Sequence, residues 1–228
     1  MNKPFMSKRN NIISYVRVVA FCFLMIGMNV CVYSQTSNET TKHINSLAQK
    51  MFVDINNRDY DAIIEMMHPK AFELVPKESF KSVFKSMFEG DEEFSIDIPK
   101  RIPEYKVSEV FKGDQNNLEY AFVSYDMNMK MTFHNQEFDE ESKKMMIGMM
   151  KVQGMDVEFI SSNTLDVLMN DRITILMKDD ATNSNWVMIN YDANSPLFVQ
   201  IVPSDLIGAA KEYQQALMLK SKKESENK

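Results

Sequence analysis

Residues 121–133 read AFVSYDMNMKMTF, and the character of the side chains changes at nearly every step. From Val123 to Thr132 each apolar residue is followed by a polar one. Successive side chains of a β-strand point to opposite faces of a sheet, so this period of two predicts a strand with one face on an apolar core. That face would carry every second residue of the stretch: Ala121, Val123, Tyr125, Met127, Met129, Met131 and Phe133.

The chain before this strand has the period of helices instead. Apolar residues recur at helical spacing from Ile44 to Ile55, which predicts a first helix that ends at residues 56–58. A short second helix should follow, capped by Asp59 or Asp61 and stopped by the His68-Pro69 step. A third helix is expected from Pro76 to Gly90.

Shorter strands should accompany the long one, at residues 105–112, 156–161, 164–169, 171–178 and 185–191, with Asn170-Asp171 as one of the turns. A methionine-rich helix is expected after Asp139, and a last helix begins at Pro203. The predicted fold is α+β: N-terminal helices packed on a curved antiparallel sheet, with an inserted methionine-rich helix and a C-terminal helix. We expect one domain over residues 35–218 and a frayed, charged tail over residues 219–228.

Residues 1–34 have the features of a removable signal peptide. Basic residues without any acid precede an apolar run from Val18 to Met28, which is far shorter than the roughly 20 residues that span a bilayer. Ser34 suits the last position before cleavage, so the mature chain would begin at Gln35 and would not stay inserted in a membrane. The expected location is periplasmic or extracellular. The alternatives are an uncleaved anchor and a lipoprotein, which Val30 before Cys31 disfavours.

Composition excludes several classes of function. Both cysteines, Cys22 and Cys31, lie in the signal segment, so the mature chain would have no disulfide, no thiol nucleophile and no cysteine metal site. Four of the 26 basic residues lie before Gln35, which leaves 22 basic against 32 acidic residues and a net charge of about −10. Nucleic acid is therefore an unfavourable partner, because neutralisation of phosphates supplies much of such binding.

Residues 52–69, FVDINNRDYDAIIEMMHP, resemble the opening of the NTF2-like superfamily (SnoaL-like, ketosteroid-isomerase-like), with Asn57-Arg58-Asp59 at the step between the first two helices. Trp186 on a late strand is similar to a tryptophan of that superfamily. The resemblance implies a curved sheet wrapped over helices, a cone whose open end is often a pocket. The isomerase members use a tyrosine and acidic residues there. No such set aligns with this sequence, so no catalytic residue is carried over.

Few side chains suggest chemistry. The three histidines, His43, His68 and His134, form no zinc motif, and the glycines form no phosphate-binding loop. Residues 54–65 superficially suggest a calcium loop, but Arg58 and Asp59 occupy a ligand position and the turn-glycine position. We therefore expect no cofactor, no metal and no catalytic residue.

Methionine is the unusual component, with 20 residues, 16 of them after Ser34. Thioethers bind Cu(I), and Met127, Met129 and Met131 form an M-x-M-x-M strand. Apolar packing is the favoured interpretation, because these residues share a face with Val123 and Phe133.

The expected function is an exported, non-catalytic binding or interaction module with a cone-type pocket for a small apolar ligand or a protein partner. The alternatives are a small-molecule isomerase, lyase or hydrolase, and a methionine-based Cu(I) carrier. A homodimer is left open. The residues expected to line the pocket or an interface are Tyr125, Met145, Met146, Met149, Met150 and Trp186.

Overall fold

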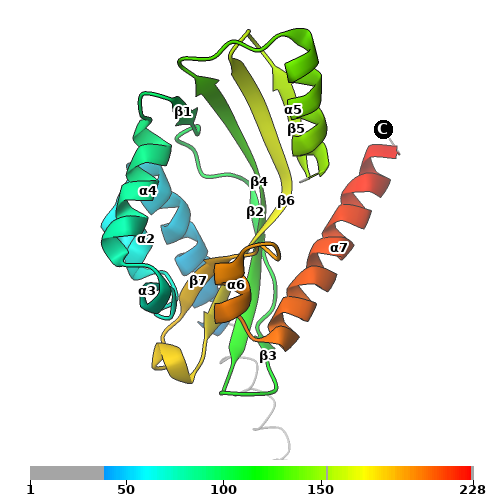
Figure 1. Ribbon diagram of the computed structural model, residues 1–228. Coiled ribbons are helices and arrows are strands. Elements are labelled where there is room, and N and C mark those ends of the chain that lie inside the picture. The colour runs from blue at the N-terminus through cyan, green and yellow to red at the C-terminus, as the bar shows by residue number, and fades with distance from the viewer. Residues whose placement is uncertain (1–38, 153, 227–228) are drawn as a thin grey trace, which may run out of the picture. The chain divides into compact units, whose positions relative to one another are not determined.

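The computed structural model describes residues 39–152 and 154–226 (Figure 1). The predicted signal peptide lies outside the described residues. The chain divides into two compact units, residues 1–43 and residues 44–228, and the architecture below is that of the second unit.

Helices open the second unit, as the sequence predicts. Residues 44–57 are helical, and α2 (Tyr60–Glu65), α3 (Ala71–Leu74) and α4 (Lys77–Glu89) follow. Asp59 caps α2, because its Oδ1 accepts a hydrogen bond of 3.0 Å from the backbone N–H of Ala62. Gly90 ends α4 with a φ of 79°, a value that glycine adopts without strain. The short helix α3 is not apparent in the sequence pattern.

Seven antiparallel strands follow in one open sheet, which confirms the α+β class. The two longest, β4 (Glu119–Phe133) and β6 (Thr164–Lys178), pair with each other and form its centre. Strands β1 (Phe94–Asp97), β2 (Tyr105–Val107) and β3 (Phe111–Lys112) pair with β4. Strands β5 (Met155–Phe159) and β7 (Val187–Asn190) pair with β6.

The turn predicted at Asn170-Asp171 is wrong, because β6 continues through it. The register shifts there: Tyr125 of β4 lies opposite Arg172, and Met127 lies opposite Met169, so β6 has one extra residue. Asp171 lies in the bulge with a φ of 53°, and its N–H donates a hydrogen bond of 2.9 Å to Asp126 Oδ1. The Asp126 carboxylate thus accepts the backbone N–H of Asp171, which has no partner in the strand ladder, and β6 continues beyond the bulge. The single strand predicted over residues 105–112 is instead two short ones, β2 and β3.

The remaining helices are α5 (Glu140–Val152), the 3₁₀ turn η1 (Asp180–Thr182), α6 (Pro196–Ile201) and α7 (Ser204–Glu226). The predicted charged tail is helical as far as Glu226, because α7 continues through it, and that its end frays stays a prediction. Two lysine–glutamate pairs lie there at four-residue spacing, Lys220 with Glu224 and Lys222 with Glu226, and such pairs support a helix.

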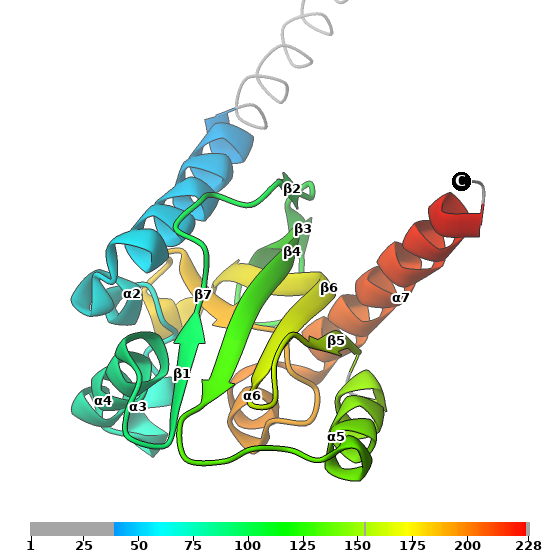
Figure 2. The ribbon, with the colours of Figure 1, turned by 90° about the horizontal axis from the view of Figure 1, so that it is seen from above.

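The two faces of the sheet bury different helices (Figure 2). Ala121 and Val123 of β4 pack with Ala48 and Phe52 of the helix at residues 44–57. Phe122, between them in sequence, belongs to the core that contains α6 and α7, and its ring stacks on Tyr213 with a centroid distance of 4.5 Å. The predicted alternation of β4 is therefore confirmed for these residues. Among residues 39–152 and 154–226, no helix combines the length and apolar character needed to cross a membrane.

Candidate functional site

A cavity of about 460 Å³ lies between the N-terminal helices and the sheet, and it is the candidate site. Its walls come from the helix at residues 44–57, from α2, α3, α4 and α6, and from strands β1, β4, β6 and β7. Its volume falls in the range of small-molecule pockets, about 300–1,000 Å³.

Methionine dominates the wall. Eight of the 25 residues that line the cavity are methionines, which is half of the sixteen that follow Ser34. They come from six different elements or their connections: Met51, Met66, Met67, Met87, Met127, Met129, Met169 and Met188. Phe84, Phe88 and Phe198, with six isoleucines and Leu197, complete the apolar surface. Such a surface favours contact with apolar ligands and adapts to their shape.

One polar cluster interrupts this wall. Thr174 of β6, only 1% exposed, donates a hydrogen bond of 2.8 Å from its hydroxyl to Asn190 Oδ1. A threonine hydroxyl has a single hydrogen, so the contact of 3.2 Å between Tyr125 and Thr174 uses the hydrogen of the tyrosine. The ring of Tyr125 meets Phe52 edge-on at 5.0 Å between centroids, which holds it in place.

His68 lies in the wall near η1, and its side chain is fully buried. Nδ1 accepts a hydrogen bond of 3.2 Å from the backbone N–H of Lys70. Nε2 lies 3.8 Å from Asp179 Oδ2 and has no hydrogen-bond partner among the described residues. Burial lowers the pKa of His68, while the Asp179 carboxylate opposes that shift.

The structure brings one of the six predicted site residues, Tyr125, to the cavity. Trp186 precedes β7, packs against the cluster around Phe52 and lies under Lys178 Nζ, which is 5.2 Å from its ring centroid. It is not among the lining residues.

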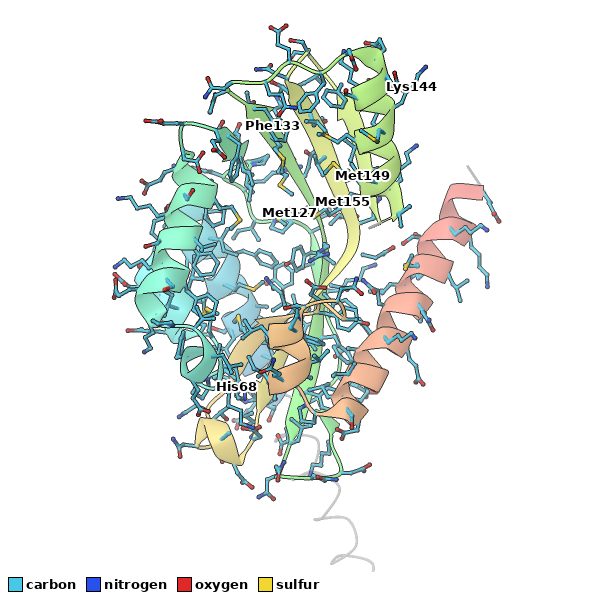
Figure 3. All side chains as sticks on the ribbon, in the orientation of Figure 1. His68, Met127, Phe133, Lys144, Met149 and Met155 are labelled. Atoms are coloured by element: carbon cyan, nitrogen blue, oxygen red, sulfur yellow. The ribbon has the colours of Figure 1, made fainter. Side chains whose placement is uncertain are left out.

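The methionines of α5 are not among the lining residues either. Figure 3 shows one of them, Met149, on α5. Met146 and Met150 pack on the cluster around Leu165 and Val167, which also contains the lining residues Met127, Met129 and Met169. Met145 and Met149 are 62% and 54% exposed. That α5 borders an interface stays a prediction.

Sequence reasoning missed most of the wall, which α4, β1, β7 and α6 supply from segments distant along the chain. The excess of methionine was the available signal, but it gives no indication of which methionines converge. In the part of the chain that the structure describes, no group of three or more His, Asp or Glu side chains could hold a metal ion. The arrangement can enclose and orient an apolar molecule. The chain matches no family model, no curated protein and no solved structure.

Proposed function

We propose that this chain is an exported, non-catalytic binding protein that holds a small, largely apolar molecule in the cavity between its helices and its sheet. One observation carries the proposal: eight methionines and three phenylalanines surround about 460 Å³. Removal of apolar ligand surface from water is the driving force for such binding, at roughly 25 cal/mol per Å².

The rival function, a small-molecule isomerase, lyase or hydrolase, would need at least two titratable groups that face the ligand. His68 directs one nitrogen to the backbone of Lys70 and the other toward Asp179. The carboxylate of Asp192 is exposed, and its Oδ1 accepts a hydrogen bond of 3.0 Å from the N–H of Asn194. Tyr125, the third titratable side chain in the wall, donates its hydroxyl hydrogen to Thr174. These contacts favour binding over catalysis.

The proposal includes a cone-type, NTF2-like arrangement and export. Helices that precede an antiparallel sheet, the cap at Asp59 and a cavity between the two layers support the NTF2-like interpretation. The basic residues and the apolar run before Gln35 support export. N-terminal sequencing of the mature protein tests export, since the first residue should be at or near Gln35. A full-length cytoplasmic product would contradict it.

A cavity-filling experiment tests the binding function. The probe is N-phenyl-1-naphthylamine, an uncharged dye whose fluorescence rises in apolar surroundings. Met127→Trp and Met87→Trp fill the cavity from the sheet and from α4, and each should weaken dye binding by about tenfold or more. Met149→Trp is the matched control, because Met149 is exposed on α5. The proposal fails if the wild type does not bind the dye, or if folded Met127→Trp and Met87→Trp proteins bind it as the wild type does.

A second candidate function, Cu(I) binding, is favoured by one observation. Met127, Met169 and Met155 occupy one row across β4, β6 and β5, each directly opposite the next. Directly opposite residues have Cβ atoms about 4.5–5.5 Å apart, so three thioethers share a face. Val167 and Leu165 extend the same face, which is typical of packing.

Thermal unfolding with Cu(I) under reducing conditions decides between the two candidates. We expect no change in Tm. A rise in Tm that Met169→Leu abolishes would establish the metal site instead.

A further inference from the structure

Three polar side chains of the cavity wall, those of Tyr125, Thr174 and Asn190, lie together where β4, β6 and β7 meet. Thr174 lies opposite Val123 of β4 and opposite Asn190 of β7, so it is the central residue of three adjacent strands. Tyr125 and Asn190 both contact its hydroxyl, at 3.2 and 2.8 Å. They are therefore no farther apart than two consecutive hydrogen bonds, and one small polar group can reach both.

The hydrogen bonds within this cluster determine what it offers to a ligand. With Thr174 donating to Asn190 Oδ1, the tyrosine hydroxyl donates to Thr174 and keeps an oxygen lone pair as an acceptor. Asn190 then has its amide N–H groups as donors. If both hydrogen bonds ran the other way, from the Asn190 amide to Thr174 and from Thr174 to Tyr125, Tyr125 would keep a free donor and Asn190 a free acceptor. In both cases the cluster presents one donor and one acceptor.

The charges of the wall limit the ligand further. Among the described residues that line the cavity there is no lysine or arginine, and the one carboxylate is that of Asp192. A carboxylate or phosphate on the ligand would lose its water without gaining a cation, which is a large cost in apolar surroundings. Arg172 lies opposite Tyr125 in the strand ladder, but it is not a lining residue.

We infer that the cavity holds an uncharged alcohol, an apolar chain or ring system with a hydroxyl group bound between Tyr125 and Asn190. A hydroxyl both donates and accepts, so it matches both free positions of the cluster. A ketone can only accept, and a protonated amine can only donate. This inference rests on the proposed function and names the chemical class of its ligand.

Displacement of bound N-phenyl-1-naphthylamine at pH 8 tests the inference with four ligands of equal chain length: 1-decanol, 2-decanone, decanoate and decylamine. We expect 1-decanol to displace the dye at a concentration about tenfold lower than decanoate or decylamine, and about threefold lower than 2-decanone. If the dye does not bind, the proposed function fails. If the dye binds and decanoate or 2-decanone matches 1-decanol, the inference alone fails.

Two variants locate the preference. Tyr125→Phe removes one member of the cluster, and it should reduce the advantage of 1-decanol over 2-decanone to less than about twofold, with each displacement corrected for the dye Kd of that variant. Arg172→Gln should leave the ranking of all four ligands unchanged. An unchanged preference in Tyr125→Phe, or a ranking that Arg172→Gln reverses, would overturn the assignment.

Discussion

The junction between the first two helices allows a sharp test, because two aspartates lie there and the structure distinguishes them. Asp59 is the cap of α2: its Oδ1 accepts the backbone N–H of Ala62 at 3.0 Å. Asp61 instead pairs with Lys81, whose Nζ lies 2.6 Å from its Oδ1, on an exposed surface. The two substitutions Asp59→Ala and Asp61→Ala should therefore differ in their cost.

The size of the effect follows from the bond that is lost. Replacing an aspartate cap by alanine leaves a helix N–H without its partner and typically costs about 1 kcal/mol. In a domain of this size that loss lowers Tm by roughly 2–4 °C. Asp61→Ala removes only a solvent-exposed ion pair, and such pairs contribute little to stability. Asp59→Asn keeps an acceptor oxygen at the cap, so it should retain most of the stability of the wild type.

Urea unfolding monitored by circular dichroism measures all three variants under one set of conditions. The expected order of destabilisation is Asp59→Ala first, with Asp59→Asn and Asp61→Ala near the wild type. Equal losses in Asp59→Ala and Asp61→Ala would refute the assignment of the cap. A loss of stability in Asp59→Asn as large as that in Asp59→Ala would refute it too, because the charge of Asp59 and not its hydrogen bond would then stabilise α2.

Three further predictions concern the core. Burial lowers the pKa of His68 below its ordinary value of 6.5, so only the unfolded chain gains a proton as the pH falls through 6.5. The free energy of unfolding should decline from pH 7 to pH 5, and less so in His68→Asn; equal declines in urea titrations would contradict this. Met146→Glu should lower the free energy of unfolding by about 1–3 kcal/mol, because Met146 packs on the Leu165 cluster. Met149→Glu, at a position 54% exposed, should change it by less than about 0.5 kcal/mol, and the reverse order in chemical denaturation would show that the two faces of α5 are misassigned. Phe198→Ala should cost about 3–5 kcal/mol by the same measurement, since Phe198 is 2% exposed, and a loss under 1 kcal/mol would argue against its place in the core.

Local chemistry made part of this fold predictable. The alternation around Tyr125 predicted β4, and the Pro76 and Gly90 signals predicted the ends of α4, because strand period and helix capping depend on neighbouring residues alone. Asn170-Asp171 was misjudged for the same reason. Turn-forming residues also form bulges, and only the partner strand, through Asp126, decides which of the two occurs.

The cavity could not be predicted from local sequence patterns. Tyr125 was selected from the apolar face of its strand, but its hydrogen-bond partner Thr174 and the next member of the cluster, Asn190, lie 49 and 65 positions farther along the chain. Nothing near Tyr125 in the sequence indicates that they meet. The methionines on α5 form a recognisable helical spacing, whereas those that line the cavity are scattered singly or in pairs over several elements. Their convergence is a property of the topology.

The methionine wall also has a thermodynamic consequence for selectivity. A methionine side chain has three rotatable bonds, and fixing it costs up to about 1.5–2 kcal/mol in rotamer entropy. A ligand that orders several of the eight methionines therefore loses part of the binding free energy that burial supplies. Ligands of different shape should order different methionines at a similar cost in entropy. The cavity should accordingly discriminate weakly by shape, with affinities spread over a narrow range among apolar bodies of equal size. Replacing lining methionines by leucine, which has fewer rotors, should raise affinity for the best-fitting ligand and narrow the set that binds.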